Sequence, residues 1–128
     1  MILNKVAESE LVTLDLTTFL PKESPLLFDL KPFLFKELIL KEKDFRNALQ
    51  LHDWTHYSNQ TVLVFCSADA IIPVWAYMLV ATYLHPVTPH IYFDNPDTWK
   101  QKILLQNIRQ FNINTYTDKR VEIGRAHV

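Results

Sequence analysis

Glycine is almost absent from this chain of 128 residues. The sequence contains one glycine, Gly124, whereas an average composition would supply roughly eight or nine. Phosphate-binding loops and dinucleotide-binding turns need glycine because the backbone must approach a phosphate closely. The usual nucleotide-binding motifs are therefore excluded as motifs, although other ways of binding a nucleotide are not.

Cysteine, excess charge of one sign and long apolar runs are scarce as well. The single cysteine, Cys66, cannot form an internal disulfide, which fits a reducing compartment. With 13 Lys+Arg against 14 Asp+Glu, there is no basic excess to neutralise a phosphate backbone. The longest apolar run, 70–84, is broken by Pro73 and Thr82 and is shorter than the roughly 20 residues of a membrane-spanning helix. We expect a cytoplasmic protein that binds no nucleic acid and no membrane.

The first half of the chain shows alternating and helical patterns. Apolar and polar residues alternate over 11–16, which predicts a half-buried strand. Residues 26–29 form a short extended candidate, and Asp29 is placed to cap the segment 30–36. An amphipathic helix is predicted from Lys43 onward. Phe45, Ala48, Leu49 and His52 repeat at helical spacing, with charged and amide residues between them.

The second half predicts strand, helix, strand and helix in turn. Residues 61–66 are almost wholly apolar, which is typical of a strand buried on both faces in a parallel sheet. Residues 74–84 predict a helix that is apolar nearly all round and therefore covered on every side. The next strand is expected at 90–93, and Asn95 followed by Pro96 is a strong helix start. The inward stripe of that helix is Trp99, Ile103, Leu104, Ile108 and Phe111.

These patterns predict a layered α/β domain with a mostly parallel sheet built from strand-helix-strand units. A weak internal repeat also emerges when residues 45–64 are laid over residues 104–123. Both segments contain an amphipathic helix, a polar turn with one tyrosine, and a strand or its start. The similarity is either coincidental or means that the chain holds half of a pseudo-repeat.

The last seven residues, 122–128, match the translation of a common sequencing adapter. We therefore expect a single domain over 1–121 and a non-native, irregular tail over 122–128. The alternative is a native frayed terminus. If the chain is truncated, the strand 61–66 and the helix 74–84 should lack part of their cover, leaving an exposed apolar patch and marginal stability.

Four segments resemble the bacterial domain of unknown function 2480 family. They are NKVAES at 4–9, LILKEKDFR at 38–46, HDW at 52–54 and CSADAIIPVWAYML at 66–79. The resemblance covers essentially 1–121 and implies no established activity. Family members continue beyond the position of Val121 with a second strand-helix-strand unit, so the resemblance implies truncation here. It also suggests an iron-sulfur cluster assembly context, as a hypothesis.

The best candidate site is the segment that follows the strand 61–66. Ligands in open α/β sheets bind outside the carboxyl ends of the strands, and Cys66, Ser67 and Asp69 lie there. In the functional interpretation Cys66 is a thiolate ligand or sulfur acceptor and Asp69 accepts hydrogen bonds. In the structural alternative Cys66 is a small buried residue, and Ser67 or Asp69 caps the next helix.

Histidines and aromatic residues add weaker candidates. His52 and His56 have the spacing of a helical metal site, but the polar stretch 53–59 predicts a turn, so no metal site is assigned. Trp75 and Tyr77 could line a pocket, together with Trp54 and Trp99, although aromatic residues at such positions are more often core.

Three functions remain open at this point. They are a non-catalytic accessory or interaction protein, a thiol-dependent factor in iron-sulfur or sulfur metabolism, and a small-molecule enzyme that lacks its second half. No catalytic residue is assigned, because no serine nucleophile motif or paired-carboxylate spacing is present. A protein partner fits the first hypothesis, while cofactor and oligomeric state are left open by the residues.

Overall fold

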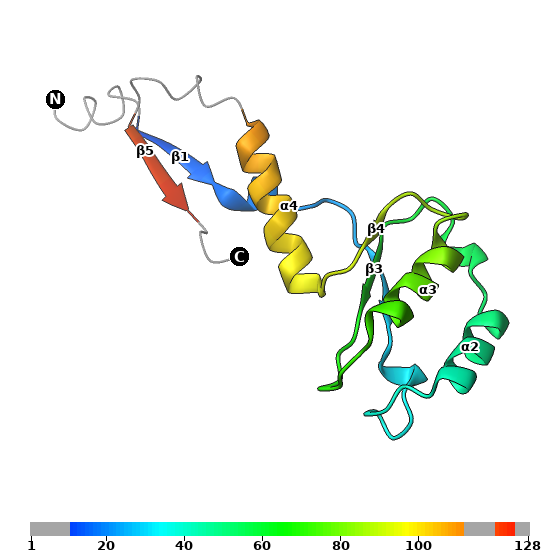
Figure 1. The fold of residues 1–128 in the computed structure, drawn as a ribbon. Helices are drawn as coiled ribbons and strands as arrows, with labels where there is room; N and C mark the ends of the chain where they lie inside the picture. Colours follow the sequence, from blue (N-terminus) through cyan, green and yellow to red (C-terminus); the bar gives the residue numbers. More distant parts are fainter. Residues whose placement is uncertain (1–10, 112–119, 125–128) are drawn as a thin grey trace, which may run out of the picture. The chain divides into compact units, whose positions relative to one another are not determined.

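A computed structural model describes residues 11–111 and 120–124 (Figure 1). The chain divides into two compact units. One unit combines 1–22 with 100–128, and the other comprises 23–99.

The unit 23–99 is built on a three-stranded parallel sheet. Its strands are β2 (Leu26–Asp29), β3 (Val62–Phe65) and β4 (Ile91–Tyr92), in the order β2-β3-β4. All three strands run parallel, with Leu26 opposite Val62 and Val62 opposite Ile91. The predicted strand 61–66 is therefore confirmed as the central strand of a parallel sheet.

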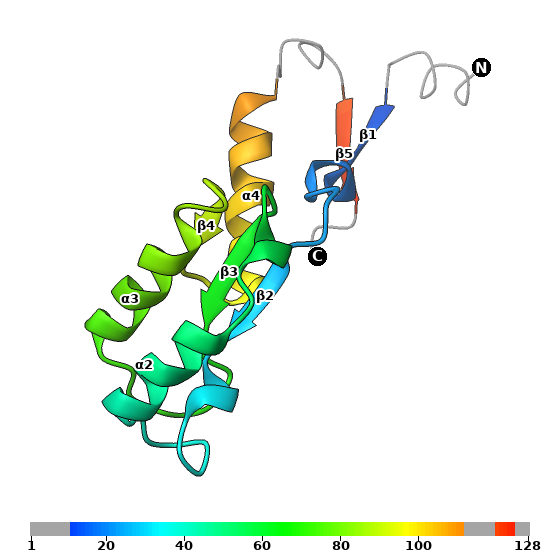
Figure 2. The same cartoon turned by 90° about the vertical axis from the view of Figure 1, so that its right-hand side faces the viewer.

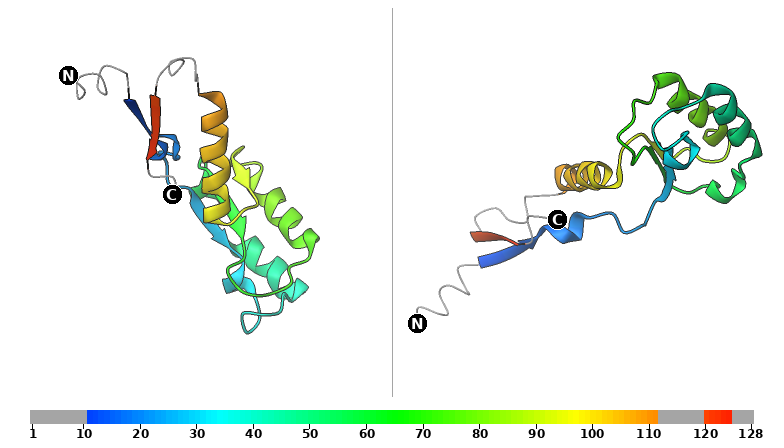
Figure 3. Two further views of the ribbon diagram at one scale, coloured as in Figure 1. Left: turned by 90° about the vertical axis from the view of Figure 1, so that its left-hand side faces the viewer. Right: turned by 90° about the horizontal axis from the view of Figure 1, so that it is seen from below.

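Two helices form the second layer of this unit. Helix α2 (Glu42–Leu51) connects β2 to β3, and α3 (Val74–Leu84) connects β3 to β4. Figure 2 and Figure 3 show the two helices side by side along one face of the sheet. The α/β layered fold expected from the sequence is thus confirmed.

The core lies between these helices and the sheet. It holds apolar side chains from β2, α2, β3 and α3, Leu30 directly after β2, and one tyrosine from the short 3-10 helix η3 (Thr55–Tyr57). Each of these elements turns only part of its surface inward, as the periods of helix and strand require. The core residues are Phe28, Leu30, Phe45, Leu49, Tyr57, Val62, Val64, Ala76, Val80 and Leu84.

The other face of the sheet carries one apolar row across the strands. Leu27, Leu63 and Tyr92 are opposite one another in the register. Leu63 is fully buried, and Tyr92 contacts Trp99, in the first turn of the following helix, with ring centroids 6.2 Å apart. The burial of β3 on both faces explains why its sequence is apolar throughout.

The segment 30–41 connects β2 to α2. The short 3-10 helix η2 (Lys31–Phe33) follows β2, and Asp29 Oδ1 accepts a hydrogen bond from Lys31 N at 3.0 Å. Asp29 thus binds the first turn through its side chain, but the cap position of η2 is Leu30, which makes no side-chain cap hydrogen bond, and the helix is shorter than the expected 30–36. The helix is short because the backbone is extended at Leu34 and has positive φ at Lys36 and Glu37, conformations that a right-handed helix does not contain.

The other unit pairs two strands in parallel. Strand β1 (Leu11–Asp15) pairs with β5 (Arg120–Gly124), with Leu11 opposite Arg120. The 3-10 helix η1 (Leu16–Phe19) follows β1, and α4 (Pro96–Gln110) extends into this unit from Lys100 onward. Phe19 and Phe111 pack edge to face at 5.1 Å.

Strand β5 corrects the expectation of an irregular segment from residue 122. Glu122 to Gly124 are its last three residues, whereas 125–128 lie outside the described residues. Apolar Val121 and Ile123 alternate with polar neighbours, which is a strand pattern. The exposed fractions of Val121 and Ile123 are 38% and 60%, so β5 forms backbone pairs with β1 without joining a buried core.

The internal repeat corresponds to real elements. The first copy runs from α2 to β3, and the second runs from α4 to β5. Val62 and Val121, which coincide when the two segments are aligned, both lie in strands that pair in parallel with an earlier strand. The second copy therefore includes a strand, as the first copy does.

None of the helices in the described residues is both long enough and apolar enough to cross a membrane.

Candidate functional site

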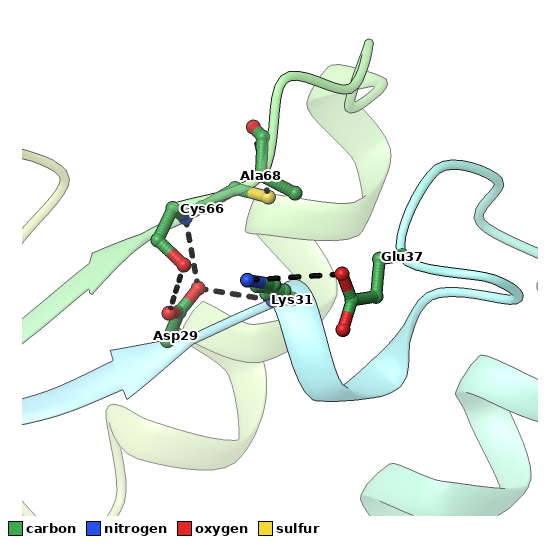
Figure 4. Close-up of polar contacts among 6 residues, drawn as sticks. Asp29, Lys31, Glu37, Cys66 and Ala68 are labelled. Carbon is green, nitrogen blue, oxygen red and sulfur yellow. Dashed lines mark hydrogen bonds and ion pairs between the residues drawn. The ribbon is translucent and has the colours of Figure 1, made fainter.

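The carboxyl ends of β2 and β3 are joined by Asp29 and Ser67. The Asp29 carboxylate accepts a hydrogen bond from Ser67 N at 2.9 Å and another from the Ser67 hydroxyl at 2.5 Å. Figure 4 shows the carboxylate between the end of β2 and the segment after β3. Partial burial raises the pKa of Asp29, but the hydrogen bonds from Ser67 and Lys31 outweigh burial and lower the pKa overall. Asp29 is therefore held as a carboxylate that anchors the segment after β3.

Cys66 is the residue between β3 and Ser67. Its side chain is half-buried, and its Sγ lies 3.7 Å from the carbonyl oxygen of Ala68 (Figure 4). The thiol is thus neither sealed inside the core nor fully exposed. Its position at the carboxyl end of the central strand is where open α/β sheets place ligands.

A pocket of about 440 Å³ opens beside Cys66. It lies at the carboxyl ends of β3 and β4 and is bounded on one side by α3. Its lining residues are Val64, Phe65, Cys66, Tyr77, Phe93 and Asn95. No charged side chain is among them, so the walls are apolar and aromatic with three neutral polar groups.

Tyr77 and Phe93 form the aromatic wall of this pocket. Their rings meet edge to face with centroids 6.1 Å apart. Burial of the phenol raises the pKa of Tyr77, and the nearby Cys66 adds to this effect. Tyr77 therefore keeps its proton at neutral pH and can donate a hydrogen bond.

Asn95 supplies the third polar group and starts α4. Its Oδ1 accepts a hydrogen bond from Thr98 N at 2.8 Å, as the sequence predicted for a capping residue. Among the described residues, its amide nitrogen has no hydrogen-bond partner. Asn95 can therefore cap the helix and still donate a hydrogen bond elsewhere.

The structure separates the five predicted site residues. Cys66 and Tyr77 line the same pocket, while Ser67 binds Asp29 and Asp69 is exposed. Trp75 lies away from the pocket lining and packs against α2. Its ring is 6.0 Å from that of Phe45 and has the Arg46 guanidinium 5.4 Å from its centroid.

The alternative role of Ser67 or Asp69 as a helix cap is wrong. Helix α3 begins at Val74 after Pro73, which makes no side-chain cap hydrogen bond. The intervening residues 68–73 carry the chain away from the strand before the helix starts. Proline at the cap position leaves the serine and aspartate too far upstream to reach the first turn.

Three contributors to this region were missed by the sequence analysis, namely Asp29, Phe93 and Asn95. Each lies at or just after the carboxyl end of β2 or β4. In a parallel sheet these ends meet at one edge. That rule, applied to all three strands and not to β3 alone, was the signal that could have found them.

His52 and His56 contribute to an aromatic cluster. Their ring centroids are 5.9 Å apart, and His52 Nε2 is hydrogen-bonded to the Tyr57 hydroxyl at 3.0 Å. Burial lowers the pKa of His52, and the positive charge of nearby His56 lowers it further, against a smaller opposing effect of Asp53. In the described part of the chain, no group of three or more His, Cys, Asp or Glu could hold a metal ion.

The outward side of α3 is exposed, so the expectation that this helix is covered all round is wrong, whereas the expected exposed apolar patch is present on it. The strand β3, which was expected to lack cover as well, is buried at Val62, Leu63 and Val64. Ala76, Val80 and Leu84 face the core, but Val74 is 73% exposed and Met78 is 63% exposed. The sequence pattern showed no polar side because α3 contains no charged residue. An apolar residue at every turn therefore gave no indication of which side faces the solvent.

The fold and this edge define a parallel α/β domain with a small, uncharged pocket at the carboxyl ends of its strands. The chain belongs to a family described as a protein of unknown function, DUF2480, whose family model matches residues 1–125. No curated protein and no solved structure matches the chain.

Proposed function

We propose that this protein is a non-catalytic interaction domain that docks a partner protein on the outward side of α3. The docking surface consists of Ile71, Val74 and Met78, which we call the α3 stripe. Their exposed fractions are 94%, 73% and 63%. Val74 and Met78 are four residues apart and lie on one side of α3, whereas Ile71 belongs to the extended segment that leads into the helix at Pro73. This exposed apolar stripe is the single observation that carries the proposal.

The composition of α3 supports a surface that is covered in the working protein. A helix on the surface of a soluble domain normally carries charged and polar residues on its outer side. The outward side of α3 continues from the α3 stripe only into Thr82 and His85, both exposed. Contiguous exposed apolar residues of this kind mark interaction sites or aggregation-prone surfaces.

The experiment compares two charge insertions on exposed apolar positions. The double variant Val74→Glu, Met78→Glu alters the α3 stripe, and Leu51→Glu alters a residue of α2 that is 88% exposed. A protein that binds the native chain and the Leu51 variant, but not the double variant, is a candidate partner. It is purified, and its affinity for each form of the chain is measured by titration. We expect the double variant to weaken such a complex by more than about tenfold, or ~1.4 kcal/mol.

Two results would overturn this function. The first is equal affinity of the native chain and the double variant for each purified partner. The second is loss of binding on Cys66→Ala with the α3 stripe intact, since the thiol-dependent alternative requires the sulfur and the interaction domain does not. Sedimentation measures whether the native protein and the double variant self-associate. If only the native protein does, the partner is a second copy of the chain.

A further inference from the structure

The pocket beside Cys66 shares no residue with the α3 stripe and has its own chemistry. Its volume of about 440 Å³ falls within the range of roughly 300 to 1,000 Å³ typical of small-molecule sites. Such sites combine apolar walls with a few placed polar groups. The pocket fits this description, with two aliphatic or aromatic residues from β3 and two aromatic rings from α3 and the segment after β4.

The polar groups of the pocket are all potential hydrogen-bond donors. The Tyr77 hydroxyl and the Asn95 amide nitrogen have no hydrogen-bond partner among the described residues. The Cys66 thiol makes only the long contact of 3.7 Å with Ala68 O. A ligand that offers an acceptor oxygen would satisfy these donors, whereas a ligand that offers only donors would not.

The charge of the lining sets a second condition. With no charged side chain in the lining, an ionic ligand would lose part of its hydration without gaining a counter-charge. The edge-to-face pair of Tyr77 and Phe93 presents ring surfaces, and aromatic rings favour stacked or edge-to-face packing against another ring.

We infer that this pocket binds an uncharged, planar aromatic molecule that carries a carbonyl or comparable acceptor oxygen. Cys66 forms part of the wall and lies next to the bound molecule. Because it is the only cysteine in the sequence, its thiol reports occupancy of the pocket without interference from another site.

The test uses 2-chloro-N-phenylacetamide, which joins a phenyl ring and a carbonyl to a thiol-reactive carbon. The Cys66 thiolate attacks that carbon, a carbon–sulfur bond forms, and the carbon–chlorine bond breaks with release of chloride; the thiol proton goes to solvent. Intact-mass spectrometry follows the rate. Chloroacetamide, which lacks the ring, is the comparison reagent, and N-acetylcysteine gives the intrinsic reactivity of each reagent toward a free thiol.

We expect the phenyl reagent to react with saturation kinetics. Relative to chloroacetamide, and after correction for intrinsic reactivity, it should label Cys66 about tenfold faster, equivalent to ~1.4 kcal/mol. Acetanilide, which has the ring and carbonyl but no reactive carbon, should slow labelling by chloroacetamide. Tyr77→Phe, which keeps the ring and removes the donor, should reduce the preference severalfold.

Two exposed phenylalanines provide a matched pair of variants. Phe93→Ala removes a pocket wall that is 50% exposed, and Phe35→Ala removes a ring that is 44% exposed outside the pocket. In Phe93→Ala alone, the ratio of the labelling rates of the phenyl reagent and chloroacetamide should fall toward the ratio found with N-acetylcysteine. The inference would be overturned if the native protein reacted with linear kinetics and with the same ratio of rates for the two reagents as N-acetylcysteine. It would also be overturned if Phe93→Ala and Phe35→Ala changed that ratio equally.

The outcome is independent of the docking proposal. Val74→Glu with Met78→Glu should leave labelling of Cys66 unchanged, and Phe93→Ala should leave partner binding unchanged. Failure of one proposal can therefore be told apart from failure of the other.

Discussion

Asp29 and Ser67, 38 residues apart in the sequence, are joined by two hydrogen bonds to one carboxylate. The same carboxylate also accepts from Lys31 N. One side chain thus fixes the turn that leaves β2 and the segment that leaves β3. Cys66 lies between the end of β3 and this link.

Asp29→Asn should destabilise the protein by about 1 to 2 kcal/mol, the range for loss of charge-assisted hydrogen bonds that are only partly buried. Asparagine keeps one acceptor oxygen but offers an NH2 group where the Ser67 hydroxyl donates. Asp69→Asn is the matched control, since Asp69 is exposed in the same segment. Urea unfolding measures both changes. Equal midpoints for the two variants would show that the link contributes nothing.

The central strand of the sheet and the start of α4 were predictable because their sequence signals are local and strong. The apolar run of β3 indicated a central strand, and Asn95 with Pro96 indicated the start of α4. The outward side of α3 was not predictable, because a helix without polar residues has no periodic signal to orient it. Strand β5 was not predicted, because residues 122–128 match the translation of a sequencing adapter and were expected to be an irregular tail. The alternation of Val121 and Ile123 with polar residues was the strand signal.

The candidate site was only partly accessible to sequence analysis. Cys66 and Tyr77 were named in advance, and the structure places both on one pocket. Asp29 and Asn95 reach the same edge from other strands, through the pairing of β2, β3 and β4. Such pairing brings distant segments together, so these residues are found only when the rule for the carboxyl ends of parallel strands is applied to all three strands, and not from one local window of sequence.

Lowering the pH should destabilise the protein through His52. Burial lowers the pKa of His52 in the folded chain, so the unfolded chain binds a proton more readily. The stability contributed by the neutral ring is complete above the ordinary pKa of 6.5 and is lost as the pH falls from there toward the folded pKa. Urea midpoints between pH 7.5 and 5 should show this decrease.

Two variants isolate the effect of His52. His52→Gln should flatten the decrease, whereas His90→Gln, at an exposed position, should retain it. The charged and titratable neighbours of His52 are His56, Asp53 and Tyr57, so the comparison keeps all three. A decrease of the same size in the His52 variant would assign the pH dependence to another group.

Two leucines near the end of α2 should respond differently to truncation. Leu49 is fully buried, and Leu51 is 88% exposed. Leu49→Ala should cost about 2 to 5 kcal/mol, since it removes apolar contacts and leaves a cavity. Leu51→Ala should change stability by less than about 0.5 kcal/mol. Equal losses measured by urea unfolding would contradict the assignment of the inward side of α2.

Asn95 performs two tasks that substitution can separate. Asn95→Ala removes the acceptor for Thr98 N and should cost about 0.5 to 2 kcal/mol. Asn95→Asp keeps an acceptor oxygen and places a negative charge at the start of α4, which the helix dipole favours, so its urea midpoint should match the native one.

The carboxylate of Asn95→Asp cannot replace the amide as a hydrogen-bond donor, however, and it introduces a charge into an uncharged pocket. The preference of Cys66 for the phenyl reagent should therefore fall in both variants, whereas stability falls only in Asn95→Ala. A native preference in Asn95→Asp would show that the amide nitrogen does not contact the bound molecule.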